Sequence, residues 1–580
     1  MRPRGSLVMQ AGNTRSDERV RRLSRPFFAT LASLGLGGIA WYVVLSLGSA
    51  LVGSLAAICL VPLVEPNQPL PSHFGWIVHG GTDVQAMVFI VVSALFALLR
   101  WRAARRGARL AGRYGMHLRQ SVHARLIDAP LSSLSDTTSA EVAHVLTYNV
   151  EIVTQGFNAL LQLLVTGMTT LVTLAMALWL SPPLLLAVPV VVVFALIASR
   201  ISSREQATVN RRFVADLTHL FWLSEDFPRR WRHIRSFGRQ AAEKYHYAEI
   251  SQQLGTGYRR QQELIASGRF ALEMLAALGI AAIFFIANRW HGVDRTALIA
   301  VCLLLGRLLP YLVSTRQSFQ YLRSSVPAFE LWHRYVDMPA SPTPDEAVAE
   351  PAGRALHIRQ LSLRSPTALD VRDLTLTPGE LTLVSGDSGI GKSSLVDVLA
   401  GMVTPDAFRA RIGDKAIDFH AYASLVRKGA YVSQSVRPWQ RTVRECLLWA
   451  APEATDAMLL QALADVGLDK RLTDATTALD TTLSSSSSRL SGGELQRLLL
   501  AQVVLHKPSM ALLDEATSAL DAASELAVLS ALKRRLPSTI LIVVSHRAGV
   551  AALADQCLAI AAGEVTVSTS PTVADRVAVS

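Results

Sequence analysis

Residues 152–199 form an apolar stretch without a single charged side chain, and this feature restricts the fold more than any other. A helix needs about 20 apolar residues to cross the hydrocarbon core of a bilayer, so the stretch is long enough for two spans. Ser181, Pro182 and Pro183 stand near its middle, and a Pro-Pro pair interrupts a helix. The sequence therefore predicts two membrane helices joined by a tight turn.

Four other apolar runs bring the predicted number of spans to six: residues 27–63, 84–99, 270–287 and 297–313. Half of the residues are hydrophobic and only 18% are charged, a composition typical of membrane proteins. The polar segments at 101–151 and 200–267 show amphipathic helical patterning rather than the composition of disordered loops. We therefore expect spans two to five to continue as helices beyond the bilayer.

Arginine clusters give the predicted topology. The chain has a net charge of +12, and Arg is concentrated at residues 15–25, 100–125 and 200–239. The segments 65–83, 181–183 and 288–296 carry few basic residues. Because basic residues accumulate on the cytoplasmic side of a membrane, this alternation predicts that both termini are cytoplasmic. It also explains the basic balance better than nucleic-acid binding does, and we expect no nucleic-acid partner.

The predicted organisation has four parts. Residues 1–24 form a basic N-terminal segment without the features of a cleaved signal, so we expect the first helix to be retained. Residues 25–337 are the transmembrane domain, 338–354 a linker rich in Pro, Ala and acid, and 355–580 an α/β domain in which strand and helix patterns alternate. Four cysteines without CxxC spacing predict reduced thiols, with neither disulfides nor a metal site: Cys59, Cys302, Cys446 and Cys557.

A phosphate-binding loop stands near the start of the α/β domain. The apolar run 381–385 is followed by GxxxxGK[ST] at residues 386–393, which opens a helix. Its glycines let backbone N–H groups face phosphate oxygens, Lys392 adds a positive charge, and the Ser393 hydroxyl is placed to bind Mg²⁺. The predicted nucleotide-binding residues here are Gly386, Asp387, Ser388, Gly389, Ile390, Gly391, Lys392, Ser393 and Ser394.

A second apolar run, residues 510–513, ends in two carboxylates. After a phosphate-binding loop, this pattern predicts that Asp514 holds Mg²⁺ and that Glu515 is the base that polarises the attacking water. The alternative is an acid pair that only caps the next helix.

Between these motifs, residues 490–497 read LSGGELQR. Together with the two motifs above, they resemble the signature of ATP-binding cassette transporters, in which the fifth residue is usually Gln rather than Glu494. In that family the signature completes the nucleotide site of the opposing subunit. The resemblance therefore implies an ATP- and Mg²⁺-dependent ATPase that works as a dimer, either of two identical chains or with a different partner. The signature residues are Ser491, Gly492, Gly493 and Glu494.

Three further positions match the family one by one. Gln434 resembles the glutamine that touches Mg²⁺, Asp521 ends a Ser-Ala-Leu-Asp motif, and His546 resembles the histidine that contacts the γ-phosphate. Two positions depart from it. The stretch 361–365 lacks the usual aromatic residue that stacks on adenine, where Arg364 is the available stacking group, and residues 484–487 are serines where exporters often have Gly-Glu-x-Gly.

Segments 126–150 and 223–239 are similar to the coupling segments of exporter-type (type IV) membrane domains. The resemblance implies an exporter fold in the cell inner membrane, with the cassette in the cytoplasm and the spans in contact with the lipid bilayer.

Polar residues in the spans are the only direct clue to the cargo. Arg307 lies in span six with Tyr311 one turn on, followed by Arg316, Gln317 and Gln320, while Gln155, Asn158 and Gln162 share a face of span three. Such groups predict either a wet, positively charged cargo cavity or hydrogen bonds between helices. Arg269 and Glu273 have the spacing of an i,i+4 ion pair.

The leading interpretation is an exporter of a peptide or of a small amphipathic natural product. Three alternatives stay open: an importer of metal–siderophore complexes on the same fold, a lipid flippase, and an ATP-gated regulator or channel. The complete hydrolytic set argues against the last of these.

Overall fold

The computed structural model describes residues 27, 29–31, 35–64, 81–134, 137–180, 230–289, 295–340, 354–365, 367–469, 478–483, 490–561 and 563–569, with scattered residues between 205 and 227. The chain divides into two compact units. One comprises Met1–Asp128 and Asp136–Met338, and the other Ala129–Ser135 and Pro339–Ser580.

The N-terminal half is helical. Its elements are α2 (Leu36–Cys59), α3 (Val61–Val64), α4 (Thr82–Asp128), α5 (Leu131–Leu134), α6 (Ser139–His144), the π-helical η2 (Val145–Asn149), α7 (Val150–Leu180), α9 (Gln240–Arg289) and α10 (Arg295–Val336). Within the described ranges, three helices are long and apolar enough to cross a membrane: Gly37–Val64, Thr82–Asp128 and Glu141–Leu180. Predicted spans five and six fall within α9 and α10, and span four lies outside the described residues, so the count of six stays a prediction.

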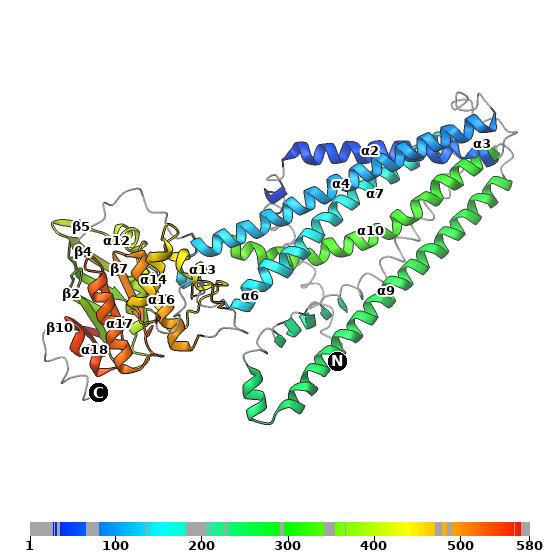
Figure 1. Ribbon diagram of the computed structural model, residues 1–580. Helices are drawn as coiled ribbons and strands as arrows, with labels where there is room; N and C mark the ends of the chain where they lie inside the picture. The colour runs from blue at the N-terminus through cyan, green and yellow to red at the C-terminus, as the bar shows by residue number, and fades with distance from the viewer. Residues whose placement is uncertain are drawn as a thin grey trace, which may run out of the picture. The chain divides into compact units, whose positions relative to one another are not determined.

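The helices pack in pairs, with α2 along α4 and α7 along α10 (Figure 1). Helix α4 has 47 residues and α9 has 50. At 1.5 Å per residue each is about 70 Å long, more than twice the ~30 Å hydrocarbon core of a bilayer. Both helices run on through the polar segments, as the amphipathic patterning predicts. A buried aromatic cluster joins α2, α4, α7 and α10, in which the Trp332 indole donates a hydrogen bond to the Leu118 carbonyl at 3.1 Å.

The second unit contains a ten-stranded sheet in the order β5-β4-β1-β2-β10-β9-β3-β8-β7-β6. The strands are β1 (Leu356–Leu363), β2 (Leu369–Leu376), β3 (Leu381–Ser385), β4 (Ala407–Ile412), β5 (Lys415–Ile417), β6 (Ala430–Ser433), β7 (Met510–Asp514), β8 (Ile540–Val544), β9 (Gln556–Ala561) and β10 (Glu564–Thr569). Strands β9, β3, β8, β7 and β6 are parallel neighbours, whereas β1 pairs antiparallel with β2 and β4.

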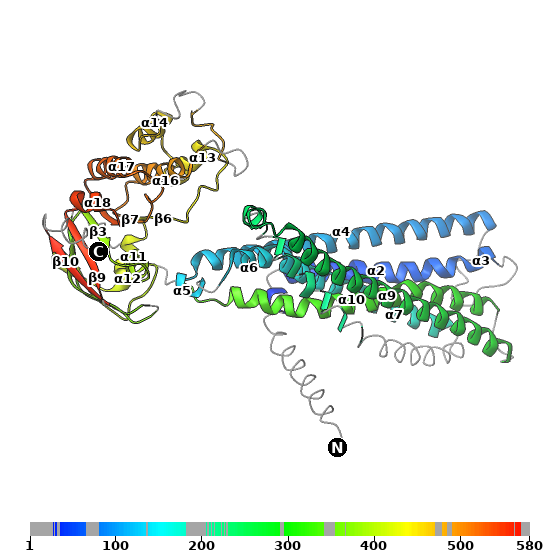
Figure 2. The same cartoon turned by 90° about the horizontal axis from the view of Figure 1, so that it is seen from below.

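Seven helices accompany the sheet among the described residues of this unit after β1: α11 (Lys392–Leu399), α12 (Phe419–Val426), α13 (Val443–Ala450), α14 (Asp456–Asp465), α16 (Gly492–His506), α17 (Ala522–Arg535) and α18 (Ala548–Leu553). Helices α13, α14, α16 and α17 contact one another and gather on one side of the cassette (Figure 2). The observed α/β unit agrees with the predicted fold class.

The central strands explain where the site lies. Strands β3, β7 and β8 are almost wholly buried, which matches their uninterrupted apolar sequences. Because these strands are parallel, the loops that follow them leave the same edge of the sheet. The loops after β3, β6, β7 and β8 therefore meet there, and they carry the predicted nucleotide-binding and hydrolytic residues.

Candidate functional site

The loop between β3 and α11 has the backbone shape that its glycines predict. Gly386, Gly389 and Gly391 have φ values of 143°, 79° and 107°. An L side chain rarely adopts such angles, and a Cβ at Gly391 would also lie 3.0 Å from the Thr367 methyl group. Gly391 is the N-cap of α11, so free N–H groups at the positive end of this helix face the loop. This geometry suits an anionic phosphate group.

Lys392 lies in this loop with 7% of its surface exposed. Its ammonium donates hydrogen bonds to the carbonyls of Gly386 at 2.7 Å and Asp387 at 2.9 Å. Burial lowers the pKa of Lys392, while the nearby carboxylates of Glu515, Asp387 and Asp514 raise it in opposition. The loop thus satisfies the charge with its own carbonyls, which compete only weakly with the oxygens of a phosphate.

A set of oxygen ligands lies at the ends of β6 and β7. The Gln434 N–H donates to the Asp514 carbonyl at 2.9 Å, and the Tyr431 hydroxyl donates to Asp514 Oδ2 at 3.4 Å. Burial raises the pKa of Tyr431, so its phenol stays protonated and remains a donor at neutral pH. The Ser393 hydroxyl, the Gln434 amide and the Asp514 carboxylate would supply the hard oxygen atoms that Mg²⁺ prefers. Mg²⁺ held there would neutralise phosphate charge.

This sparse ligand set fits a metal that is held largely by phosphates and water. Within the described residues, no group of three or more His, Cys, Asp or Glu side chains is arranged to hold a metal ion alone. Mg²⁺ in nucleotide sites usually takes one or two carboxylates and completes its shell from the substrate.

Glu515 follows directly after β7 in a left-handed backbone conformation, with φ 51°. Its carboxylate Oε1 lies 3.5 Å from His546 Nε2, and its N–H donates to the Val544 carbonyl at 3.3 Å. A positive φ is uncommon for Glu and costs about 1–3 kcal/mol, a strain that occurs often in active sites. The structure thus brings together the predicted base and the histidine predicted to contact the γ-phosphate, which follow different strands.

The signature motif opens α16. Ser491 is the N-cap: its hydroxyl accepts from the Glu494 N–H at 3.3 Å, and Glu494 Oε2 accepts from the Ser491 N–H at 2.6 Å. This reciprocal pair is a capping box, which Gln would also form. The Glu494 carboxylate is therefore directed back onto its own helix terminus. A Cβ at Gly493 would lie 3.0 Å from the Ala519 carbonyl, so the small residue allows close packing against that loop.

Asp521 makes a helix-capping contact that the sequence motif does not predict. It is the N-cap of α17, where its Oδ2 accepts from the Ser524 N–H at 3.1 Å. Hydrogen bonds from Ser524 lower the pKa of Asp521, so the carboxylate stays charged at the helix N-terminus.

Two stretches depart from the family pattern, residues 361–365 and 484–487, and the structure describes only the first. The Arg364 N–H donates to Asp406 Oδ2 at 2.7 Å, and the Arg364 residue is exposed. Residues 484–487 lie outside the described part of the chain. Sequence reasoning missed Tyr431, Glu525 and Arg547, because each is a single residue that joins the site only through contacts distant in sequence.

In the membrane half, Arg307 of α10 is packed between neighbouring helices. Its guanidinium carbon lies 4.7 Å from the Phe96 ring centroid of α4, and a Cβ at Gly53 of α2 would lie 1.9 Å from Nη2. The charge interacts with Tyr311, yet neither Nη atom meets hydrogen-bond geometry with any described residue. This arrangement is a cation held by an aromatic face within an apolar region.

The other polar residues of the spans differ from Arg307. The Arg269 guanidinium donates to Glu273 Oε1 at 2.8 Å, which confirms the expected ion pair. Gln155, Asn158 and Gln162 are exposed along one face of α7.

Comparisons with known proteins find relatives for both the helical half and the α/β half of the chain. Residues 78–291 match the family model for the ABC transporter transmembrane region, and residues 369–518 match the ABC transporter model. The solved structure of a bacterial Atm1-family ABC exporter with ATP bound superposes with a TM-score of 0.73, covering 93% of this chain and 95% of that chain at 19% identity. That likeness establishes the exporter fold.

Curated relatives include the ATP-dependent lipid A-core flippase of Ralstonia nicotianae, 27% identical over 78% of both chains, and that of Chromobacterium violaceum, 27% identical over 79% of this chain and 80% of the relative. The Escherichia coli glutathione/L-cysteine transport system ATP-binding/permease protein CydC is 30% identical over 50% of this chain and 52% of its own. The chain is therefore an ABC transporter, in which a transmembrane region is fused to a cassette that hydrolyses ATP, with Mg²⁺, to drive transport.

Proposed function

We propose that two copies of this chain export an anionic amphiphile, with a phosphate-bearing lipid as the cargo class. The observation that carries the proposal is Arg307, a cation in an apolar helix environment whose Nη atoms lack hydrogen-bond geometry with the described residues. A charged side chain within a membrane span is costly unless it has a counter-charge or a function. The lipid A-core flippases named among the relatives act on an amphiphile, which supports a lipid over a peptide.

The lining around Arg307 favours a charged headgroup. Gly53 leaves room for the guanidinium, and Phe96 covers one of its faces. The Arg307 Nη atoms are buried in this conformation, and an anionic group that reached them would complete their hydrogen bonds with charge-assisted geometry. The apolar helix surfaces around it suit acyl chains.

In the proposed cycle, ATP binds against the loop of Lys392, and Glu515 accepts a proton from the attacking water. His546 orients that water and contacts the γ-phosphate. Two chains are needed because the signature at the start of α16 faces the nucleotide of the partner cassette. We propose that the dimer lies in the cell inner membrane with both cassettes and all termini in the cytoplasm, which the distribution of Arg supports.

The test is ATPase stimulation of the full chain in nanodiscs by a phosphate-bearing lipid, with a zwitterionic lipid as reference. Arg307→Ala should weaken half-maximal stimulation about 10- to 100-fold, since a hydrogen bond to a charged group contributes roughly 1.5–3 kcal/mol. The matched control is Arg269→Ala, which removes an Arg already paired with Glu273. Stimulation of Arg307→Ala equal to that of wild type would assign Arg307 to helix packing alone.

A second candidate cargo is a small anionic thiol, because the transport system named for the CydC relative handles glutathione and L-cysteine. Glutathione in the same assay separates the two: stimulation by glutathione and none by the lipid would favour the thiol. The peptide cargo expected from the sequence stays a prediction, and a peptide that alone stimulates hydrolysis would support it.

A further inference from the structure

A buried carboxylate outside the predicted site connects the two loops that carry Glu515 and His546. Glu525 lies in the first turn of α17 with 2% of its surface exposed. Its Oε1 accepts hydrogen bonds from the Thr517 hydroxyl at 2.6 Å and the Ser545 hydroxyl at 3.2 Å, and its Oε2 accepts from Arg547 Nη1 at 3.1 Å. Thr517 follows β7, whereas Ser545 and Arg547 follow β8.

The second arm of Arg547 closes the connection. Its Nη2 donates to the Ser518 carbonyl at 3.3 Å, and the Ser518 N–H donates to the Glu515 carbonyl at 3.1 Å. One guanidinium therefore binds both the buried carboxylate and the turn that begins at Glu515. His546 stands between Ser545 and Arg547, both of which contact this cluster.

The same cluster reaches the signature helix. Gln496 of α16 donates to the Ser518 hydroxyl at 3.3 Å and accepts from the Ala519 N–H at 2.9 Å. The turn after Glu515 is thus held from both sides, by Arg547 and by α16.

The energetics explain why such a cluster is needed. A strained φ persists only where surrounding contacts determine the backbone, and Glu515 has φ 51°. A buried carboxylate is stable only when it is paired with a cation and hydrogen-bonded. Arg547 pairs with Glu525, and the hydroxyls of Thr517 and Ser545 donate hydrogen bonds to it. Each of these contacts ends on a residue within three positions of Glu515 or next to His546. The cluster therefore links the backbone segments that carry Glu515 and His546.

We propose that Glu525 and Arg547 are positioning residues for ATP hydrolysis, which hold Glu515 and His546 in their working geometry without touching the nucleotide. The proposal rests on the proposed roles of Glu515 and His546. It predicts a loss in kcat rather than in nucleotide affinity, because the loop of Lys392 makes none of these contacts among the described residues.

The experiment measures ATP hydrolysis and ATP affinity of the full chain in nanodiscs. Glu525→Gln keeps the volume but turns a donor towards Arg547, and kcat should fall about 10- to 100-fold with KM within about threefold of wild type, the pattern of a loss confined to the transition state. Arg547→Lys keeps the charge but loses the second contact, from Nη2 to the Ser518 carbonyl. Its kcat should lie between those of wild type and Glu525→Gln.

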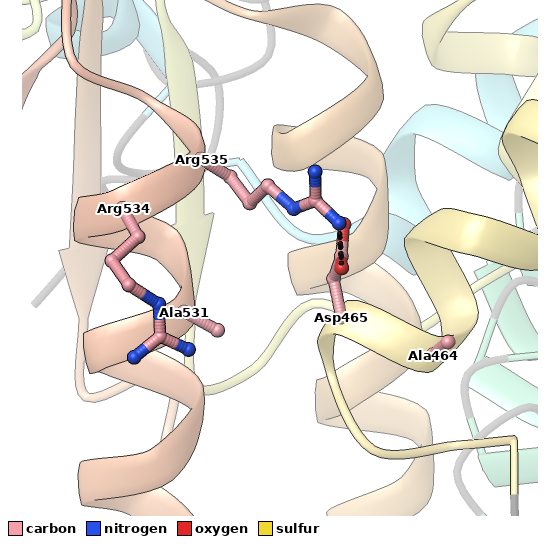
Figure 3. A pocket seen from close by; sticks show the side chains of 5 residues that line it. All are labelled: Ala464, Asp465, Ala531, Arg534 and Arg535. Atoms are coloured by element: carbon pink, nitrogen blue, oxygen red, sulfur yellow. Dashed lines mark hydrogen bonds and ion pairs between the residues drawn. The ribbon is translucent and has the colours of Figure 1, made fainter.

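The control lies on the same helix and is drawn in Figure 3. Arg535 Nη2 forms an ion pair with Asp465 Oδ1 at 2.7 Å, at the far end of α17 beside a surface cavity. Arg535→Met loses this pair but contacts neither hydrolytic loop, so its kcat should equal that of wild type.

A double mutant separates positioning from general damage. If Glu525 acts through Glu515, single-turnover hydrolysis by Glu515→Gln/Glu525→Gln should be as slow as by Glu515→Gln alone, because residues that act as a unit are non-additive. Additive losses, or a wild-type kcat in Glu525→Gln, would overturn the proposal. Wild-type hydrolysis by Glu515→Gln would instead overturn the proposed base.

If Glu525→Gln does not fold, Thr517→Val gives the same answer. It removes one hydrogen bond to Glu525 while leaving the pair with Arg547 intact. A kcat reduced severalfold at unchanged KM supports the proposal, and an unchanged kcat contradicts it.

Discussion

Gly156 lies at a close contact between α7 and α10, and replacing it tests how tightly the membrane half is packed. A Cβ at this position would lie 2.2 Å from Ser325 Oγ and 2.3 Å from Ser325 Cβ. Ser325 is itself 3% exposed. Because Cβ positions are fixed by the backbone, no rotamer change relieves the second contact. The two helices must separate by more than about 1 Å to restore ordinary carbon–carbon distances.

We expect Gly156→Ala to destabilise the protein by about 1–3 kcal/mol, the usual cost of overpacking, although Ala favours a helix by up to ~1 kcal/mol. The matched control is Gly167→Ala on the same helix, where a Cβ would meet nothing within 4 Å. The assay is thermal unfolding of the purified full chain in detergent. The double mutant Gly156→Ala/Ser325→Gly should regain stability relative to Gly156→Ala.

The close contact is contradicted if Gly156→Ala unfolds at the same temperature as Gly167→Ala, or if the added Ser325→Gly substitution restores no stability. In either case α7 and α10 would not approach as closely as the structure shows.

Two shorter predictions concern the cassette. Ser491→Ala removes the N-cap of α16 and should lower the free energy of unfolding, measured with denaturant, by about 1 kcal/mol. Ser491→Thr keeps a capping hydroxyl and should retain most of that stability. Equal losses in the two variants would contradict the capping role of Ser491. Burial raises the pKa of Cys446 to about 12. Maleimide at pH 8 should therefore leave Cys446 unlabelled in the native protein and label it after denaturation, and rapid native labelling would contradict its burial.

The positions of the predicted nucleotide-binding residues follow from local pattern and strand order. The glycines of residues 386–391 require positive φ, and the acids Asp514 and Glu515 follow a buried strand. Parallel pairing then brings these loops to one edge of the sheet. The capping box of Ser491 and Glu494 is also a local feature, because the two residues stand three positions apart.

Other features depend on contacts that no local pattern encodes. The carboxylate of Glu525 looks like an ordinary first-turn acid until β8 places Ser545 and Arg547 beside it. The contact of Gly156 with Ser325 joins helices far apart in the chain, and the aromatic neighbour of Arg307 comes from α4. Hydropathy predicts the membrane spans, but their packing depends on contacts between residues far apart in the chain.

ATP-driven transport by the full chain in proteoliposomes, compared between wild type and Glu515→Gln, is the most direct test of an ATP-driven lipid exporter. We expect wild type to move a labelled phosphate-bearing lipid between leaflets only with ATP and Mg²⁺. The variant should bind ATP but hydrolyse it at least about 100-fold more slowly, the usual contribution of a general base, and should move no lipid. Hydrolysis and lipid movement by Glu515→Gln at the wild-type rate would contradict transport driven by Glu515-dependent ATP hydrolysis.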